Sequence, residues 1–409
     1  MKFVVTDTLF EHALQTTNEH RDSGPIKVTK IEPQTVTGVC TGLLSDVHYY
    51  RIHYTCDDST YTKSLVVKIP FNKPCFEISR DRGYYSSEYL LYYTILPEFN
   101  KLLKTELTPK QYTSTQDLVV ILDNLVDQGF ANVDKFQQLN LAQTVSSLQL
   151  LARFQAASYQ LNEIKPHLFK FYKRKIEIGK YVVEQLNRGF EALVKFIEED
   201  DDLKPYLEYM KTAIENFRNT PSIVCRYDSN RISTLNHGDY WINNILFKET
   251  GDNGLELRMI DFQLARWVPP VFDIIKLIVC SVQFDVIQNH SSEIFQAYVD
   301  EFNATLKSVR CNYSYTIDQF YSDMKYQRYN YLVQIAIFLR ALYALPESVV
   351  ANESNNDAIN LEKMFIQDPS KELHYKQRLS PWLKYFKETD IFQLNDEDGS
   401  SSLATSSNE

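Results

Sequence analysis

The sequence predicts an α+β fold with two lobes, a small β-rich N-lobe followed by a large, mostly helical C-lobe. The chain has 409 residues, more than the roughly 250–300 at which a single hydrophobic core stops growing. Apolar segments with strand-like spacing are concentrated before residue 124, whereas helical spacing dominates after residue 139. The hydrophobic fraction of 44% and the charged fraction of 23% are typical of a globular protein and exclude wholesale disorder.

The N-lobe is expected to contain a sheet and two helices. The segments that favour strands are residues 47–56, 61–69 and 118–122. The last of these is continuously apolar, which is typical of a strand buried on both faces. Residues 8–16 and 86–96 have helical character. Pro97 is expected to end the second helix, because proline lacks a backbone N–H.

The C-lobe is expected to be helical around one embedded group of strands. Leu141, Val145, Leu148, Ala152 and Gln155 advance by four, three, four and three positions, which is the spacing of a core-facing helix. Further helical segments are 169–218 and 271–386, and expected strands are 232–236, 245–248 and 255–260. A polar stretch joins the last two strands, so they are expected to form a hairpin.

Charge, apolar length and cysteine spacing exclude several classes of protein. The 43 Lys and Arg against 53 Asp and Glu give a net charge of −10, which is unsuited to binding nucleic acid through clustered cations. The most apolar stretches, 271–284 and 332–345, are shorter than the roughly 18–20 residues that cross a bilayer, so both are interpreted as buried helices. The six cysteines contain no C-x-x-C pair. Neither a zinc site nor a disulfide framework is therefore expected, and the protein is expected to be cytoplasmic.

The chemically most informative segment contains His237-Gly238-Asp239. Asn244 follows Asp239 by five positions, and Asp261 follows Asn244 by seventeen, across the predicted hairpin. Kinase-type phosphoryl transfer needs such a set. One carboxylate lies beside the acceptor hydroxyl, while an amide oxygen and a second carboxylate hold Mg²⁺ against the triphosphate. The alternative is that His237 and Asp239 cap a turn and that Asp261 ends a strand.

Two upstream residues complete this machinery in the required order. Lys68 closes an apolar strand, where a lone cation is costly unless an anion meets it. Glu88 follows twenty residues later, near the start of the second predicted helix. In kinase folds a strand lysine binds the α- and β-phosphates and a helix glutamate holds it in place. The alternative is a solvated surface lysine and an ordinary helix glutamate.

Two further segments are candidates for contact with a nucleotide. Gly38, Gly42 and Ser45 precede the first long strand, where glycines would let backbone N–H groups approach phosphates; a plain turn is the alternative. Asp123 and Leu125 follow the last strand of the N-lobe, at the natural connection between lobes, where the backbone could meet adenine. Two interpretations of Asp123 remain, a hydrogen bond to the ribose or the start of a turn.

Asp273 and His237 are expected to support the catalytic loop rather than to take part in chemistry. Asp273 lies twelve residues after Asp261 on an apolar helix, and a buried carboxylate must find hydrogen-bond donors. We expect those donors to be backbone N–H groups of the 237–244 loop.

These residues resemble the ecdysteroid kinase-like (CHK kinase-like) family of arthropods. This family is part of the choline kinase and aminoglycoside phosphotransferase group within the bilobal protein-kinase-like fold. The resemblance covers about residues 30–390, and its strongest marks are segments 67–70, 237–244 and 260–266 and the helix that contains Glu88. The hinge and the Phe154-Gln155-Ala156 segment depart from the family's common Leu-Glu-Asp-Leu and Phe-His-Ala. Protein kinase activity is disfavoured, since Asp-Phe-Gln replaces Asp-Phe-Gly and no Ala-Pro-Glu segment follows.

The resemblance implies roles for the site residues and an ATP- and Mg²⁺-dependent phosphotransferase with an alcohol acceptor. Asp239 would be the catalytic base, and Lys68 with Glu88 would organise the nucleotide. Asn244 and Asp261 would bind Mg²⁺. Residues 1–124 would form the nucleotide-binding lobe and 125–394 the catalytic and substrate lobe, followed by a Ser- and acid-rich, disordered tail at 395–409.

The acceptor implied by the resemblance is a hydroxyl of an ecdysteroid, or of a plant or xenobiotic compound that is being detoxified. Its apolar part would lie among aromatic residues such as those of 326–343, for which a core role is the alternative. Two other functions remain open. One is a catalytically silent kinase-fold protein that binds a hydrophobic hormone, and the other is a kinase of a small polar alcohol, choline- or aminoglycoside-like. The protein is expected to act as a monomer, without nucleic acid or a membrane span.

Overall fold

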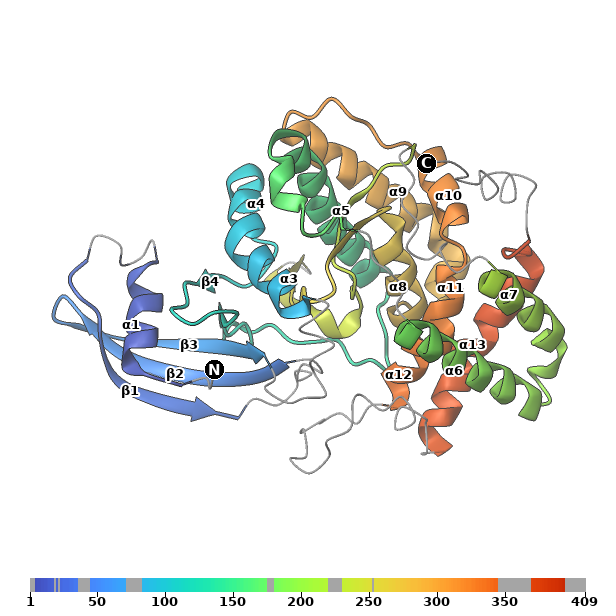
Figure 1. The fold of residues 1–409 in the computed structure, drawn as a ribbon, viewed down its shortest axis with the longest axis horizontal. Helices are drawn as coiled ribbons and strands as arrows, with labels where there is room; N and C mark the ends of the chain where they lie inside the picture. The colour runs from blue at the N-terminus through green and yellow to red at the C-terminus, as the bar shows by residue number, and fades with distance from the viewer. Residues whose placement is uncertain are drawn as a thin grey trace, which may run out of the picture.

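The computed structural model describes residues 4–17, 20, 23–35, 45–70, 83–174, 180–219, 230–251, 254–344 and 369–393. Figure 1 shows a β-sheet with one helix against it at one end of the molecule and a large helical body at the other. The fold class expected from the sequence, α+β with a small β-rich N-lobe and a mostly helical C-lobe, is confirmed. Gly38, Gly42 and the tail 395–409 lie outside the described residues, and the lobe boundary at residue 124 stays a prediction.

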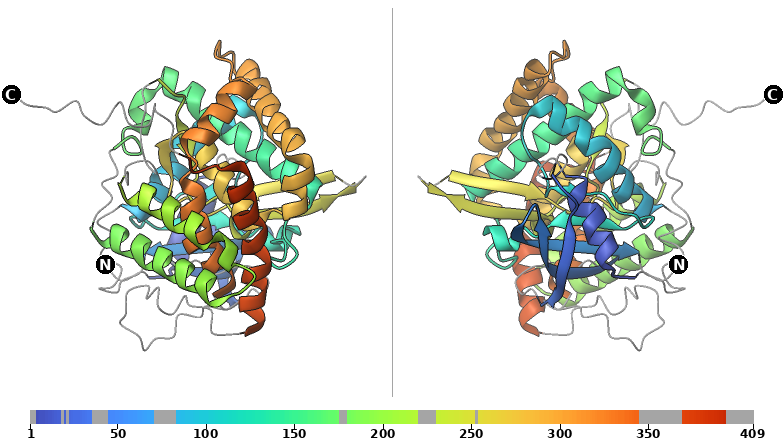
Figure 2. Two further views of the ribbon diagram at one scale, coloured as in Figure 1. Left: turned by 90° about the vertical axis from the view of Figure 1, so that its right-hand side faces the viewer. Right: turned by 90° about the vertical axis from the view of Figure 1, so that its left-hand side faces the viewer.

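The N-lobe contains a five-stranded antiparallel sheet in the order β1-β2-β3-β5-β4. Its strands are β1 (Lys27–Gln34), β2 (Ser45–Cys56), β3 (Ser59–Pro70), β4 (Gln111–Tyr112) and β5 (Val120–Asp123). Helix α1 (Asp7–Gln15) packs against this sheet, and its buried Leu9 and Phe10 belong to the same apolar cluster as Ile52 and Val67 (Figures 1 and 2). The alternation of β2 and β3 therefore gives the sheet one apolar face, which α1 covers.

A continuous helical segment connects the sheet to the C-lobe. It consists of α3 (Tyr84–Leu90), a π-helical turn η2 (Leu91–Ile95) and α4 (Leu96–Leu103). The expectation that the helix ends at Pro97 is wrong. The wider π turn ends at Ile95, two residues before the proline, with Leu96 N–H bonded to the Leu91 carbonyl. Such a turn relieves the clash of the proline ring with the preceding turn. Phe99 of α4 then packs on Phe154 in the C-lobe, with ring centroids 5.4 Å apart.

The C-lobe is built on two long helices, α5 (Leu141–Ile164) and α9 (Phe284–Ser308), which pack against each other. Asn140 and Gln143 form a capping box that starts α5 where the apolar stripe begins. The other α-helices are α6 (Lys180–Glu199), α7 (Leu207–Asn219), α8 (Val271–Ser281), α10 (Ile317–Tyr326), α11 (Asn330–Val333), α12 (Leu339–Ala344) and α13 (Pro369–Thr389). All eleven residues of α8 are buried, which confirms that the first apolar stretch is a core helix. No helix in the described part of the chain is long and apolar enough to cross a membrane.

Two short antiparallel pairs of strands lie within the helical lobe. β7 (Ile245–Thr250) and β8 (Gly254–Met259) form the predicted hairpin, which extends from the body in both views of Figure 2. β6 (Thr234–Asn236) pairs with β9 (Arg266–Val268), a strand too short to be predicted from its sequence. Because β6 ends directly before His237 and β8 ends directly before Ile260, the two pairings bring the loops 237–244 and 260–265 to the same place.

Candidate active site

Lys68 connects the two lobes through ion pairs. Its Nζ donates to Glu88 Oε1 at 2.6 Å and to Asp261 Oδ1 at 3.1 Å. Lys68 is on β3, Glu88 is on α3, and Asp261 follows β8. Burial works against the charge of Lys68, but the two carboxylates outweigh it, so the pKa of Lys68 is raised. One buried cation thus faces two carboxylates.

The backbone around Asp261 is held in an unusual conformation. Asp261 has a φ of 70°, the left-handed region that Asp tolerates better than most residues. Ile260 N–H donates to the Asn244 carbonyl at 3.1 Å, and the buried Phe262 ring lies 4.5 Å from the His237 ring, centroid to centroid. Ser87 Oγ donates to the Phe262 carbonyl at 3.2 Å. These contacts attach the Asp261 loop to both lobes.

His237 connects the Asp239 and Asp261 loops. Its Nε2–H donates to the Ile260 carbonyl at 2.9 Å, and its Nδ1 accepts from the Asp239 N–H at 3.3 Å. This pair of bonds requires the neutral ring. Burial lowers the pKa of His237 to about 4, which is consistent with that state.

Gly238 is required where the loop passes Leu264. It has a φ of 81°, and a Cβ at this position would lie 1.9 Å from the Leu264 carbonyl oxygen. The flanking backbone is held by Asp273, in the first turn of α8, which accepts from His237 N–H at 2.6 Å and from Gly238 N–H at 2.9 Å. Burial raises the pKa of Asp273 to about 7, while the two N–H donors act in the opposite direction.

Asp239 and Asn244 face each other across the loop. Asn244 Nδ2 donates to Asp239 Oδ2 and to the Asp239 carbonyl, at 2.9 Å in each case. The Asp239 side chain is 20% exposed and that of Asp261 is 21% exposed, so solvent reaches both carboxylates. Asn244 uses its amide nitrogen in these bonds, and the amide oxygen is the atom with which an asparagine binds a metal.

Two residues that the sequence did not single out hold this loop in place. Asn132 Nδ2 donates to the carbonyls of Ile242, Asn243 and Ile245 at 3.0–3.3 Å. Nothing in the local sequence around Asn132 signals this contact, because it joins segments more than a hundred residues apart.

The second residue, Lys276, forms an ion pair with Asp239 Oδ1. Lys276 is 1% exposed and lies on α8, three positions after Asp273, which places both side chains on one helix face. The available signal was a lysine in the middle of a helix that is otherwise almost entirely apolar.

The hinge residues are engaged within the protein. Asp123 is 8% exposed, and its carboxylate accepts from Tyr112 Oη at 2.6 Å and from Gln128 Nε2 at 3.2 Å. Lys63 Nζ lies 3.2 Å from the same carboxylate. Leu125 is buried in a small cluster that includes Phe130. The structure therefore does not join Asp123 and Leu125 to the group around Asp239.

Ser45 lies near Lys68 at the end of the sheet. It opens β2 and pairs with Pro70, two positions beyond the pair of Val47 with Lys68. Its buried hydroxyl has no hydrogen-bond partner among the described residues, which is unusual for a buried polar group.

The residues around Asp239 and Asp261 fit a metal that a triphosphate helps to bind. Within the described ranges, no three His, Cys, Asp or Glu side chains gather in a way that could hold a metal by themselves. Mg²⁺ is usually bound by one or two carboxylates together with substrate phosphates and water. The carboxylate of Asp261 and the amide oxygen of Asn244 supply that type of partial ligand set.

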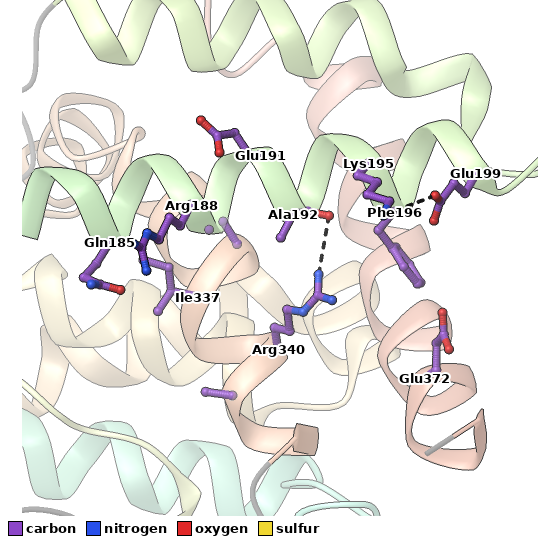
Figure 3. A pocket seen from close by; sticks show the side chains of 13 residues that line it. Gln185, Arg188, Glu191, Ala192, Lys195, Phe196, Glu199, Ile337, Arg340 and Glu372 are labelled. Carbon is purple, nitrogen blue, oxygen red and sulfur yellow. Dashed lines mark hydrogen bonds and ion pairs between the residues drawn. The ribbon is translucent and has the colours of Figure 1, made fainter. Parts of the chain in front are cut away.

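A cavity of about 620 Å³ lies elsewhere in the C-lobe, between α6, the segment Gln334–Ala344 and α13 (Figure 3). Its lining mixes charged and apolar side chains, including Arg188, Glu191, Phe196, Ile337 and Arg340. None of the site residues expected from the sequence lines it. Of the aromatic residues in 326–343, Tyr329, Tyr331 and Tyr343 are buried in the core, whereas Phe338 is only partly buried.

The model of the ecdysteroid kinase-like family matches residues 42–311 of this chain. The chain belongs to the ecdysteroid kinase-like family. The resemblance recognised in the sequence is therefore confirmed, and the matched range contains every ion pair described above. Membership in this kinase-like family supports a small-molecule phosphotransferase.

Comparison with solved structures returns small-molecule kinases. An ethanolamine kinase of Plasmodium vivax is 14% identical with a TM-score of 0.44, covering 88% of this chain and 83% of that one. The GDP complex of a mutant aminoglycoside 2'-phosphotransferase-IIIa is 12% identical with a TM-score of 0.44, covering 94% and 100%. A microcompartment-associated aminopropanol kinase is 11% identical with a TM-score of 0.37, covering 95% and 99%. Comparison with curated protein sequences finds no match.

Proposed function

We propose that this protein transfers the γ-phosphoryl group of ATP, with Mg²⁺, to a hydroxyl of an uncharged, largely apolar small molecule such as an ecdysteroid or a related xenobiotic alcohol. The observation that carries the proposal is the convergence of Lys68, Asp239, Asn244 and Asp261. Lys68 lies on a strand that is far in the sequence from the two loops carrying the other three residues. Hydrogen bonds and an ion pair join the strand and the two loops in one cluster.

On the nucleotide side, Lys68 would contact the α- and β-phosphates while Glu88 keeps its ammonium group in place. Asp261 and Asn244 would hold Mg²⁺, whose charge offsets that of the phosphates during transfer. The buried hydroxyl of Ser45, which has no hydrogen-bond partner among the described residues, would be a further donor toward the nucleotide. Phosphoryl transfer depends mainly on positioning and electrostatics, so residues that hold these groups still are as important as the groups themselves.

On the acceptor side, Asp239 would accept a hydrogen bond from the substrate hydroxyl and align its oxygen with the γ-phosphorus. The surroundings of Asp239 favour an uncharged acceptor over a cationic one. Lys276 already neutralises this carboxylate, and the partly buried ring of Phe338 lies against Lys276. An ammonium substrate of the choline or aminoglycoside type would find no uncompensated negative charge at Asp239, whereas a neutral, apolar alcohol needs none.

The test is a screen of the purified protein with Mg-ATP and a panel of ecdysteroids, plant phenolics, choline and aminoglycosides, read by a mass gain of one phosphate. We expect the gain on a neutral alcohol and its loss in the Asp239→Asn variant. Tight binding of a steroid without any mass gain would instead support the catalytically silent binding protein. A gain confined to choline or aminoglycosides would contradict the proposed acceptor class.

A further inference from the structure

Lys276 is a buried lysine in a helix whose eleven residues are all buried. Its ammonium group forms an ion pair with Asp239 Oδ1. The same group lies 3.4 Å from the centroid of the Phe338 ring and 5.3 Å from that of Trp241. One carboxylate oxygen and two aromatic faces therefore surround it, and this arrangement restricts the rotamers of both partners.

Stability does not explain why such a lysine is present. Replacing a buried ion pair with apolar residues of similar size is often neutral or stabilising, because desolvation of the charges offsets their attraction. Both neighbours of Lys276 along α8 are apolar, Ile275 and Leu277, and a methionine or leucine would suit this environment. The feature that an apolar residue could not supply is a directed contact with Asp239.

That contact determines which part of Asp239 is available to a substrate. A carboxylate has about four sites for hydrogen-bond donors. Lys276 uses one on Oδ1, and Asn244 Nδ2 uses one on Oδ2. Because a different residue holds each oxygen, rotation about the Cβ–Cγ bond would break both bonds. The Asp239 side chain is still 20% exposed, so its remaining acceptor sites are not all covered by the protein.

We propose that Lys276 is a positioning residue for phosphoryl transfer, which acts by fixing the Asp239 carboxylate toward the acceptor hydroxyl. This inference rests on the proposed function, since it assigns Asp239 to the acceptor. Positioning of this kind is catalytically large, because a displacement of about 1 Å at a reacting group costs on the order of 100-fold in rate.

The kinetic test is Lys276→Met, which keeps an unbranched side chain of similar length and removes the ammonium group. We expect kcat to fall on the order of 100-fold, while the KM for ATP stays unchanged because Lys68 and Asp261 are untouched. Lys211→Met is the matched control, since Lys211 is 43% exposed and forms an ion pair with Glu208, a neighbouring residue of its own helix. A kcat within twofold of wild type in Lys276→Met would overturn the proposal, as would an equal loss in the control.

An unfolding cycle tests the pairing without reference to activity. Asp239→Asn alone leaves Lys276 without its carboxylate, so we expect a lower Tm. Adding Lys276→Met to Asp239→Asn removes the unpaired cation, so the double variant should recover most of the lost Tm. Strictly additive Tm changes would show that the two residues do not act as a pair. If the wild-type protein transfers phosphate to no compound of the panel, the proposed function fails, while the unfolding cycle still reports whether Lys276 and Asp239 act as a pair. If the wild-type protein is active and Lys276→Met has a normal kcat, only the positioning role of Lys276 fails.

Discussion

Two buried lysines each pair with a carboxylate of the candidate site, Asp261 or Asp239, and they are held differently. Lys68, from the sheet, lies between two carboxylates, Glu88 and Asp261. Lys276, from the buried helix α8, has one carboxylate, Asp239, and the aromatic rings of Phe338 and Trp241. The group around Lys68 therefore has a net charge of −1, whereas the pair of Lys276 and Asp239 has no net charge.

This difference in net charge indicates which kind of ligand each group would bind. An excess carboxylate is unfavourable in a partly buried site unless a cation accompanies it, and in the proposed function Mg²⁺ bound to a triphosphate would provide one. A balanced pair beside an aromatic ring has no need of a charged partner, which suits a neutral alcohol. The predictions below test this distinction, beginning with the largest expected effect.

Asp261→Asn and Asp239→Asn should both reduce turnover on the order of 1,000-fold, but for different reasons. Asp261→Asn removes the carboxylate of the nucleotide side, so isothermal titration should show that Mg²⁺ no longer strengthens ATP binding. Asp239→Asn should leave that Mg²⁺-dependent binding intact. If both variants lost Mg²⁺-dependent binding equally, the division into two sides would be wrong.

Lys68→Met should lower the free energy of unfolding by about 3–5 kcal/mol, because it leaves Glu88 and Asp261 as adjacent uncompensated carboxylates. Adding Glu88→Gln should restore part of that loss. Lys63→Met, on the same strand, is the control. Lys63 is 25% exposed beside Asp123. Asp123 keeps its hydrogen bonds from Tyr112 and Gln128 when Lys63 is replaced, so a smaller loss of stability is expected in this variant. Urea unfolding gives the free energy of unfolding of all three variants. An equal decrease in Lys68→Met and Lys63→Met would contradict the interpretation that Lys68 compensates two carboxylates.

His237 joins the two sides, and its burial predicts a pH dependence of stability. Its pKa is about 4 in the folded protein against 6.5 for an ordinary histidine. Between these two pH values the unfolded chain therefore binds the proton more readily than the folded protein does. The contribution of neutral His237 to the free energy of unfolding is fully present above pH 6.5 and is lost as the pH falls toward 4. The expected loss is about 3 kcal/mol, measured by urea unfolding across this range.

His237→Asn should flatten this part of the pH profile. His290→Asn, on the surface of α9 where the side chain is 43% exposed, should leave it unchanged. A wild-type profile that is level from pH 6.5 to 4 would show that His237 is not held as a neutral ring.

The smallest effect concerns the choice of acceptor. Choline and neohexyl alcohol have the same shape, but the alcohol has carbon in place of the charged nitrogen. Because Lys276 neutralises Asp239, choline would lose hydration of its charge without gaining a net negative partner. This should favour the neutral molecule by roughly 10-fold in kcat/KM, or in inhibition of transfer to a better acceptor. Lys276→Met should narrow that ratio. A preference for choline would reverse the interpretation of the acceptor side.

The order of strands and helices could be predicted because apolar spacing is a local property. The continuation of the helix through Pro97 could not, since it depends on a π turn that local propensity does not reveal. The ion pairs of Lys68 with Glu88 and Asp261 join residues that the sequence had already identified. Asn132 and Lys276 were missed, because each acts on a loop that is distant in the chain.

Asp123 was identified from the sequence, but its partners could not be. Its position after a buried strand suggested either a ribose contact or a turn. In the structure its carboxylate accepts hydrogen bonds from Tyr112 and Gln128. Tyr112 lies on a two-residue strand, which is too short for the apolar pattern to predict.

The most direct test of the account is a crystal structure of the protein with Mn²⁺ and a non-hydrolysable ATP analogue, with the metal located by its anomalous scattering. The account predicts a peak within coordination distance of Asp261 and the Asn244 amide oxygen, with the γ-phosphate directed toward Asp239. A metal bound elsewhere, or a triphosphate that points away from Asp239, would contradict it.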